Sequence, residues 1–488
     1  MPHLRLALAQ GFPGLAGTGN PGRMDGTAWF IEEPSMLTYR DALRAIFQRT
    51  DYERQGQPPY KERVYRLDRT RELLQQLGDP HEAYPSVHIA GTKGKGSTMA
   101  MIDAVLRAAG YRTGMYSSPH LHTFRERIRI GAELIPEEDV ARMIEGMLPI
   151  LESRPDVTVF EIITALAMRY YADRQVDFGV FEVGMGGRLD ATNVLRPVVS
   201  VITSISLDHI SVLGDTIEAI AREKAGIIKS EIPVVTAPQR PEAMQVIRDT
   251  CASHDAPLTV AGLDWCWRFE GSDLSGQSLT VYTPGNEDAA EFPALWIPLL
   301  GAHQLENACT AVAAIDVLQR SGVSIGRDAV RRGLAKVRWP GRMEVLGQAP
   351  LVVVDGAHNP YSVRRLLEAL REYLSYRRII LIFGAGHTHN PEGQLALLLP
   401  AVDVTYVTQA KHAKATPAAD LKLMADGLGH QAIAVGSVGE ALKQGLHQAT
   451  EDDLVLVTGS LFVVAEAREA WAEFKGLPPL PSDPPGVY

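Results

Sequence analysis

Short apolar runs alternate with amphipathic stretches through the first half of the chain. Four of these runs are typical of short buried strands, with helical spacing of apolar residues between them: residues 111–117, 177–185, 198–205 and 233–237. Strands that alternate with helices pair in parallel, because each helix carries the chain back across the sheet. The pattern therefore predicts a parallel sheet with helices on its faces.

The pattern changes between residues 258 and 300, where short runs alternate with Gly, Ser and Asp turns. This composition predicts a small antiparallel β insertion, followed by a helix over about 307–319. The segment Trp339-Pro340-Gly341-Arg342 then predicts a hinge, since Pro and Gly interrupt both helices and strands.

After the hinge the alternation begins again. It predicts strands at 351–355, 379–383, 404–409 and 454–458, and amphipathic helices at 361–374, 437–448 and 463–474. These elements favour a second, smaller doubly wound domain. Two α/β domains joined by a hinge imply a cleft between them, with ligands bound outside the carboxyl ends of the strands.

The same patterns divide the chain into five segments. Residues 1–36 are rich in Gly and Pro and lack periodicity, which predicts an extension that is disordered or mis-assigned, with Met36 as a candidate start. The other segments are a large domain at 37–338, a hinge at 339–345, a smaller domain at 346–476 and a Pro-rich tail at 477–488.

Composition excludes several classes of function. Of the 488 residues, 22% are charged and 45% are hydrophobic, which is ordinary for a soluble protein. The net charge of −10 argues against nucleic acid as the main partner. No apolar run approaches the ~18 residues needed to cross a bilayer, and the three cysteines lack metal-type spacing. We therefore expect a cytoplasmic protein that binds neither nucleic acid nor membrane.

Residues 91–97 predict a phosphate-binding loop between a short apolar strand and a helix. Its glycines allow backbone N–H groups to face one anion, the helix start is positive, and Lys95 adds an ammonium group. The common pattern places Ser or Thr directly after the lysine. Here Gly96 follows Lys95, so a hydroxyl for magnesium comes from Ser97 or from elsewhere. An ordinary turn with a solvated lysine is the alternative.

Eight motifs follow one another along the chain: Gly91-Thr92-Lys93-Gly94-Lys95-Gly96-Ser97, Ser117-Ser118-Pro119-His120-Leu121, the run from Glu182 to Asn193, Leu207-Asp208-His209, Glu223-Lys224-Ala225-Gly226-Ile227, Gly301-Ala302-His303-Gln304, Trp339-Pro340-Gly341-Arg342 and Asp355-Gly356-Ala357-His358-Asn359-Pro360. In this order they resemble folylpolyglutamate synthase and its dihydrofolate synthase relatives, of the Mur ligase superfamily, over about residues 37–475.

The resemblance implies an α/β protein with an N-terminal P-loop ATPase domain, which has a parallel sheet and a small antiparallel insertion, and a smaller C-terminal Rossmann-like glutamate-ligase domain. It implies ATP-dependent addition of L-glutamate to a folate carboxylate through an acyl phosphate, by a monomer. Two departures from the family pattern, in the segments 61–67 and 384–390, leave the acceptor open between dihydropteroate, reduced folates and both. Val159 also stands where a tyrosine is frequent.

The resemblance also implies ligands for ATP and for two magnesium ions, and it leaves room for a monovalent cation. Ser118 and Glu182 map to one magnesium site and His209 to the other, with Lys224 carbamylated beside it. Taken alone, these residues could be a turn serine, a structural histidine and a solvated lysine; only a buried strand-end glutamate favours function by itself. The ATP-binding set is Gly91, Thr92, Gly94, Lys95, Gly96, Ser97, Asn307, Arg342 and Asp355.

Two further sets come from the resemblance. Lys95, His358, Ser460 and carbamylated Lys224 form the catalytic set, although His358 and Ser460 could instead cap helices. The pterin side is expected to involve Thr158, Phe160, Glu161, Leu189, Asp190 and Ala191. A core position at the start of an amphipathic helix is the alternative for Phe160.

Two rival functions remain. The peptidoglycan-precursor ligases share the ATP domain but carry an extra N-terminal domain, and the roughly 50 helical residues at 37–86 are too few for a nucleotide-binding domain of ~100 residues. A nucleotide-gated binding protein without ligase activity would not need a second domain with polar strand-end loops.

Overall fold

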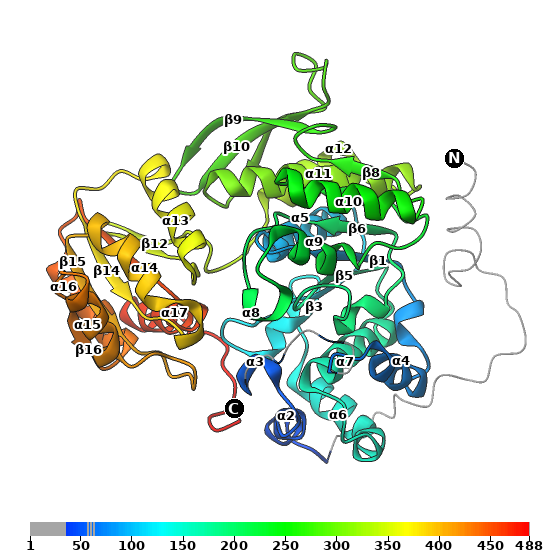
Figure 1. Ribbon diagram of the computed structural model, residues 1–488, viewed down its shortest axis with the longest axis horizontal. Helices are drawn as coiled ribbons and strands as arrows, with labels where there is room; N and C mark the ends of the chain where they lie inside the picture. Colours follow the sequence, from blue (N-terminus) through cyan, green and yellow to red (C-terminus); the bar gives the residue numbers. More distant parts are fainter. Residues whose placement is uncertain (1–35, 56–57, 59–60, 62–63, 488) are drawn as a thin grey trace, which may run out of the picture.

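The computed structural model describes residues 36–55, 58, 61 and 64–487, and Figure 1 shows its two α/β parts side by side. The prediction for residues 1–35 lies outside the described residues. The N-terminal part is built on one sheet, whose strands run in the order β4 (Glu133–Leu134), β3 (Ile128–Ile130), β2 (Thr113–Tyr116), β5 (Phe178–Glu182), β1 (Ser86–Ala90), β6 (Val199–Ile202), β7 (Val234–Thr236) and β8 (Leu258–Val260).

This sheet confirms the parallel arrangement predicted from the apolar runs. Strand β1 lies between β5 and β6 and pairs in parallel with both, while only the short β3 and β4 join antiparallel at the far edge. Alternate side chains enter different cores: Val87 and Ile89 face one core and Ala90 the other, as the two-residue period of a strand requires. The phosphate loop therefore leaves the centre of the sheet.

Helices cover both faces of the sheet. One face packs against α5 (Lys95–Ala108), α11 (Ala302–Arg320) and α12 (Arg327–Ala335). The other packs against two groups: α2 (Tyr39–Phe47), α4 (Leu67–Gln76), α6 (Glu137–Ser153) and α7 (Val159–Asp173), and then α9 (Ile217–Ala225) and α10 (Pro241–Ser253). Helix α11 begins five residues before the predicted start at 307, because the first turn contains His303 and Gln304 rather than an apolar repeat.

The predicted β insertion is present but begins later than expected. Strands β9 (Cys266–Asp273), β10 (Gly276–Tyr282) and β11 (Phe292–Ile297) form a separate antiparallel sheet beside α11 and α12 (Figure 1). Residues 258–260, which the pattern assigned to the insertion, instead form β8 and pair in parallel with β7. That assignment was wrong because a three-residue edge strand has too few positions to show its period.

The C-terminal part has a sheet of its own, as predicted. Its order is β12 (Glu344–Gln348), β13 (Leu351–Val354), β17 (Leu454–Thr458), β14 (Ile379–Phe383), β15 (Val404–Thr408) and β16 (Ile433–Val435), with only β12 antiparallel. The sheet is flanked by α13 (Pro360–Tyr373), α14 (Pro391–Leu398), α15 (Ala418–Gly427), α16 (Val438–Gln448) and α17 (Leu461–Phe474). Sequence patterns missed β12, β16, α14 and α15.

Short elements complete the described residues: α3 (Tyr52–Gln55), α8 (Ile210–Leu213), and the 3-10 turns η2 (Pro80–Glu82), η3 (Phe124–Arg127), η4 (Ala191–Val194), η5 (His387–His389) and η6 (Leu399–Ala401). None of the described helices combines the length and the apolar character that crossing a membrane requires.

The tail after α17 runs back to the N-terminal part (Figure 1). The Asp483 carboxylate accepts hydrogen bonds from the Tyr39 hydroxyl at 2.7 Å, the Thr123 hydroxyl at 2.6 Å and the Phe124 amide at 2.6 Å. Val487 is buried in the core that contains α2 and α6. The tail therefore joins the C-terminal part to the loop that precedes η3.

We expect an Asp483→Ala variant to release this tail, because three donors lose a charged acceptor at a cost of about 1.5–3 kcal/mol for each bond. Hydrogen exchange should become faster at Phe124 and in residues 477–487, and trypsin should cleave after Lys475 sooner. Glu473→Ala is the matched control, since Glu473 is exposed on α17. Unchanged exchange at Phe124 would contradict the tether.

Candidate active site

The phosphate loop connects β1 to α5 and makes a tight turn against neighbouring elements. Gly94 has φ +89° at the N-terminal cap of α5 and lies against Asn307, whose Oδ1 atom would be 2.3 Å from a Cβ there. Gly96 faces the Trp339 ring, 2.6 Å from where its Cβ would be. The glycine that departs from the common pattern is therefore explained by packing: the indole of the hinge requires a residue without a side chain.

Two loop amides are already used inside the protein. The N–H groups of Thr92 and Lys93 both donate to the Ser204 carbonyl, at 2.9 and 3.1 Å, and the Thr92 hydroxyl donates to the Ser206 carbonyl at 3.2 Å. The N–H groups of the first turn of α5, which begins at Lys95, have no acceptor within the helix. An anion would therefore bind at the start of α5, and Thr92 fixes the loop to the end of β6.

Glu182, at the end of β5, lies next to this helix start. Its carboxylate is 3.7 Å from the Lys95 ammonium group. Burial raises the pKa of Glu182, while Lys95 and a hydrogen bond from the Ser118 backbone favour its ionised form. The structure thus brings together Lys95, Glu182 and Ser118, three residues that come from different motifs.

A polar cleft adjoins the loop. It is lined by Gly91, Thr92, Lys95, Gly184, Met185, Gly186, Asp208, His209, Leu213 and Lys224. Lys224 is buried there and its ammonium group donates to the Gly91 carbonyl at 2.7 Å. Burial, followed by the positive charge of Lys95, lowers the pKa of Lys224 to about 7. A surface position for this lysine is therefore excluded.

The oxygen atoms near Glu182 fit magnesium better than a softer metal. Magnesium takes one or two carboxylates and completes its shell with water and phosphate oxygens, and the buried Glu182 beside Ser118 offers that chemistry. His209 lies in the adjoining cleft with Asp208, in a left-handed conformation with φ +48°. Among the described residues no group of three or more His, Cys, Asp or Glu side chains could hold a metal alone.

The C-terminal part contributes the opposite wall. The Arg342 guanidinium lies across Gly356, 2.4 Å from the position of a Cβ there. The Asp355 carboxylate accepts from the amides of Met343 and Ala357, both at 2.8 Å. Burial raises the pKa of Asp355, and Arg342 opposes that shift. The positive charge of Arg342 also favours the ionised form of Glu182 in the N-terminal part.

Two predicted site residues, Ser460 and Asn307, lie in or next to the first turns of helices. Ser460 is the N-terminal cap of α17, where its hydroxyl accepts from the Phe462 amide at 3.1 Å. Asn307 lies in the second turn of α11 and donates to the Gln304 side chain at 3.0 Å. Ser460 thus has the capping contact that was its alternative interpretation, and Asn307 adjoins the phosphate loop.

Sequence patterns missed two contacts of Lys93, an ion pair within the N-terminal part and a hydrogen bond to the C-terminal part. The Lys93 ammonium group is 2.8 Å from the Asp208 carboxylate and 3.4 Å from Nε2 of His358. Although burial alone would raise it, Lys93 holds the pKa of Asp208 far below its usual range. Burial lowers the pKa of His358 well below its usual value, so its ring is neutral. Residues 93 and 358 are far apart along the chain, so sequence patterns could not predict this contact.

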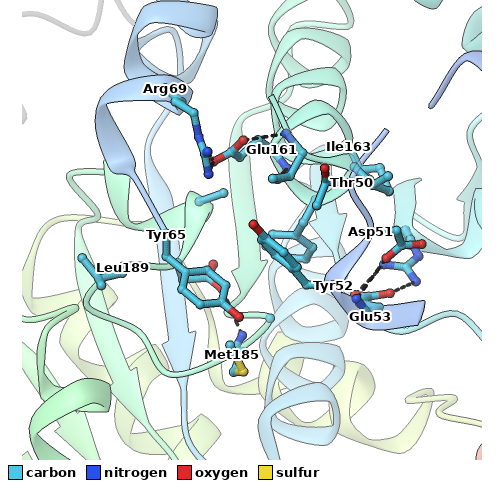
Figure 2. Close-up of a pocket in the computed structure, with 17 residues that line it drawn as sticks. Thr50, Asp51, Tyr52, Glu53, Tyr65, Arg69, Glu161, Ile163, Met185 and Leu189 are labelled. Atoms are coloured by element: carbon cyan, nitrogen blue, oxygen red, sulfur yellow. Dashed lines mark hydrogen bonds and ion pairs between the residues drawn. The ribbon is translucent and has the colours of Figure 1, made fainter. Parts of the chain in front are cut away.

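A second, largely apolar cavity adjoins the cleft, and Gly184 and Met185 line both. Figure 2 shows this cavity with Met185 in its wall. All six residues predicted for the pterin side line it: Thr158, Phe160, Glu161, Leu189, Asp190 and Ala191. The edge of Phe160 lies on Gly184, 2.5 Å from where a Cβ would be. Phe160 is partly buried: it packs against the core that contains α7 and also lines the cavity.

The cavity also contains residues that the sequence did not single out. Tyr52 and Tyr65 pack together with ring centroids 5.3 Å apart. Arg69 forms a buried ion pair with Glu161 at 2.9 Å (Figure 2), and Glu161 also accepts from the Thr158 amide at 2.7 Å. The Glu161 carboxylate thus caps α7 and neutralises Arg69. An amphipathic helix gives no signal that one of its arginines is buried.

Asp190 connects the wall of this cavity to the loop after β5. Its carboxylate accepts from the Met185 amide at 3.0 Å and from the amide and hydroxyl of Thr192 at 3.0 and 2.5 Å. Burial raises the pKa of Asp190, and the hydroxyl of Thr192 opposes that shift. The Glu182-to-Asn193 motif therefore places one carboxylate at the cleft and another at the cavity.

Comparison with known proteins identifies both parts of the chain. Residues 89–315 match the Mur ligase middle domain, and residues 341–461 match the Mur ligase glutamate ligase domain. A Bacillus subtilis dihydrofolate synthase/folylpolyglutamate synthase is 36% identical over 411 residues, which are 83% of this chain and 94% of the relative. A probable bifunctional folylpolyglutamate synthase/dihydropteroate synthase from Halobacterium salinarum is 39% identical over 409 residues.

The chain spans about half the length of that relative, 49%, although the match takes 82% of this chain. Solved structures share the fold. Mycobacterium tuberculosis folylpolyglutamate synthase complexed with ADP superposes with a TM-score of 0.79 at 31% identity, over 91% of this chain and 100% of the other. Escherichia coli FolC in complex with DHPP and ADP gives a TM-score of 0.75 at 30% identity, over 91% of this chain and 100% of the other.

Proposed function

The chain belongs to the folylpolyglutamate synthase/dihydrofolate synthase family of Mur ligases, and from that premise we propose that it is an ATP-dependent ligase that adds L-glutamate to a folate carboxylate. The folate carboxylate would attack the γ-phosphorus of ATP, forming an acyl phosphate and releasing ADP. The amino group of glutamate would then attack the acyl carbon, and phosphate would leave with the electron pair of the broken C–O bond.

One observation carries this proposal: the polar cleft and the apolar cavity share Gly184 and Met185. An aromatic ring system in the cavity could thus extend a carboxylate past these residues toward the start of α5. Relatives solved with ADP, and with DHPP and ADP, support a nucleotide in the cleft and a pterin-like ligand in the cavity. Holding the two reactants in one geometry lowers the entropic part of the barrier to their reaction.

We assign the phosphate site to the start of α5 and to the positive groups around it. Lys95 and Arg342 bring two cationic side chains near the single carboxylate of Glu182. This excess of positive charge favours a triphosphate and the charge that develops on its oxygens during transfer. Asn307, Arg342 and Asp355 would hold the rest of the nucleotide. Arg342 lies on the hinge, so its contact with phosphate would depend on how the two parts close.

A divalent cation, magnesium by its donor set, would be held by Ser118 and Glu182, with a second at His209. Bound there, it would neutralise charge on the phosphate oxygens. Lys224 lies in the His209 cleft, and we propose that its amine is carbamylated, which converts a buried cation into an anion. We further propose that His358 and Ser460 lie on the side of the site that takes glutamate. A monovalent cation could also bind, and we propose that the protein acts as a monomer.

The cavity residues are compatible with more than one acceptor. Phe160, Tyr52 and Tyr65 provide aromatic surfaces, and Asp190 provides a buried carboxylate that could accept from the amino and N–H groups of a pterin. These groups suit both dihydropteroate and reduced folates, because both carry the bicyclic pterin skeleton with its amino and N–H groups; they differ in the oxidation state of that skeleton and in the glutamate at the far end. We therefore propose one or both as acceptors.

Phosphate release and product mass test the proposed function. The protein is incubated with MgATP and glutamate, with either dihydropteroate or tetrahydrofolate added. We expect phosphate release that requires an acceptor and a product heavier by one glutamate residue. Stimulation by neither acceptor would overturn the proposal. ATP hydrolysis at a rate that depends on neither glutamate nor the acceptor would instead favour a nucleotide-gated binding protein.

A further inference from the structure

Lys93 stands between the two parts of the active site, two residues before the lysine that faces Glu182. The two side chains diverge: Lys95 points to the end of β5, and Lys93 to the loop after β6. The Lys93 ammonium group also meets Nε2 of His358, which lies between β13 and α13 of the C-terminal part. Lys93 therefore contacts both halves of the site.

The partner of Lys93 in the N-terminal part is firmly placed. Asp208 accepts from Lys93 at 2.8 Å through one carboxylate oxygen and from the His209 amide at 3.0 Å through the other. Both side chains of the pair are mostly buried, with 24% and 15% exposed. A partly buried ion pair with both oxygens engaged keeps the ammonium group in one position better than an exposed pair does.

The partner in the C-terminal part is equally fixed. Nδ1 of His358 lies 2.8 Å from the Gly356 carbonyl, which can only accept, so Nδ1 carries the ring proton. The His358 amide donates to Ser362 at 3.1 Å, and Gln394 donates to the His358 carbonyl at 3.0 Å. The His389 ring packs edge-on with its centroid 5.2 Å away. Nε2 is thus a lone-pair acceptor that faces the phosphate loop.

We propose that Lys93 is a positioning residue that fixes His358 of the C-terminal part beside the phosphate loop. It does so by linking two rigid groups: Asp208 holds its charge, and its N–H group donates to Nε2 of His358. This role rests on the proposed function. Lys93 would be the loop residue that holds the C-terminal part in place where the amide bond forms. Lys93 is neither a catalytic group nor the main ligand of the triphosphate in this assignment.

The test compares Lys93→Met, which keeps the length but removes the donor, with Lys93→Arg, which keeps a charged donor. Steady-state kinetics with an acceptor give kcat and KM for ATP and for glutamate. Calorimetry gives the dissociation constant of ADP, and hydroxylamine added without glutamate traps the acyl phosphate as a hydroxamate. Lys422→Met is the matched control, since Lys422 pairs with Asp426 on α15, far along the chain from the cleft.

We expect Lys93→Met to lower kcat with glutamate about 100-fold, the cost of misplacing a group in the site by about 1 Å. ADP affinity, the melting temperature and hydroxamate formation should stay at their wild-type values, and Lys93→Arg should recover most of the rate. In His358→Ala, which removes the positioned ring, adding Lys93→Met should cause no further loss, because residues that act as a unit are not additive.

Three results would overturn the inference: an unchanged kcat in Lys93→Met, a raised ADP dissociation constant with hydroxamate lost in parallel, or losses that multiply in the double variant. The second would make Lys93 a phosphate ligand. If Lys93→Met melts early, Lys93→Arg and the double-variant comparison decide. A wild-type protein that forms no amide product with either acceptor would refute the proposed function, whereas wild-type turnover with an unaffected Lys93→Met refutes this inference alone.

Discussion

A Lys95→Met variant is expected to lose about 10³-fold in kcat, the upper effect of removing one preorganised charge from a transition state. The Lys95 ammonium group lies at the start of α5, where the helix amides have no internal acceptors, and 3.7 Å from Glu182. Negative charge that develops on the transferred phosphate would be stabilised by the Lys95 ammonium group and by the free amides at the start of α5. Methionine has nearly the same length and no charge, so the loss would measure charge compensation rather than a cavity.

The fold should survive this substitution, because the Lys95 side chain is still 18% exposed and its pair with Glu182 is loose at 3.7 Å. Circular dichroism and thermal melting test that expectation beside steady-state kinetics. Lys336→Met serves as the control, since Lys336 is exposed at the end of α12. A Lys95→Met protein that keeps its shape and its rate would show that the loop binds no phosphate.

Sequence patterns predicted the fold where the elements are long and buried. Strands β14 and β17 have the predicted bounds, since five consecutive buried residues leave no ambiguity. Strand β16 was missed because two of its three residues, Ile433 and Ala434, are exposed at the sheet edge. Strand β12 was missed because it begins inside the predicted hinge and only half buries its side chains. Edge elements take their structure from neighbours rather than from their own pattern.

For the candidate site, too, some features could be predicted from the sequence and others could not. Motifs located the residues at strand ends, and the structure brings Lys95, Glu182 and Ser118 together as the motifs imply. Contacts between distant segments could not be predicted: Gly96 against Trp339 and Lys93 against His358 arise only when the chain is folded. A glycine after the phosphate-loop lysine looked like displaced metal chemistry, whereas the indole of Trp339 gives it a packing reason.

The aromatic cavity shows how burial changes the meaning of a residue. Tyr52 and Arg69 lie in short amphipathic helices where tyrosine and arginine usually face solvent. Here Arg69 is buried with Glu161, so its charge is neutralised before a ligand arrives. Aromatic faces and the carboxylate of Asp190 line the same cavity, and the ion pair holds α4 against α7.

Removal of dissolved CO₂ is expected to lower activity, and its return should restore activity faster at pH 8 than at pH 6. Lys224 is buried, donates to the Gly91 carbonyl at 2.7 Å and has a pKa lowered to about 7, by burial first and by Lys95 second. Because this pKa lies between the two, the amine is mostly neutral at pH 8 and mostly charged at pH 6. Only the neutral amine attacks CO₂, forming the N–C bond and losing one proton to water.

Isotopically labelled bicarbonate identifies the modified lysine, since a carbamate signal should appear in wild type and vanish in Lys224→Met, with kcat lower by at least about 100-fold. Lys229→Met is the matched control. Lys229 is partly buried, with a pKa lowered by burial to about 8, and its ammonium group is held by the Asn193 carbonyl and side chain at 3.0 and 2.7 Å. We expect Lys229→Met to keep both the carbamate signal and kcat, because Lys229 does not line the cleft that contains Lys95 and Lys224. A carbamate signal that persists in Lys224→Met, or a Lys224→Met enzyme with wild-type kcat, would assign Lys224 to the support of the Gly91 turn instead.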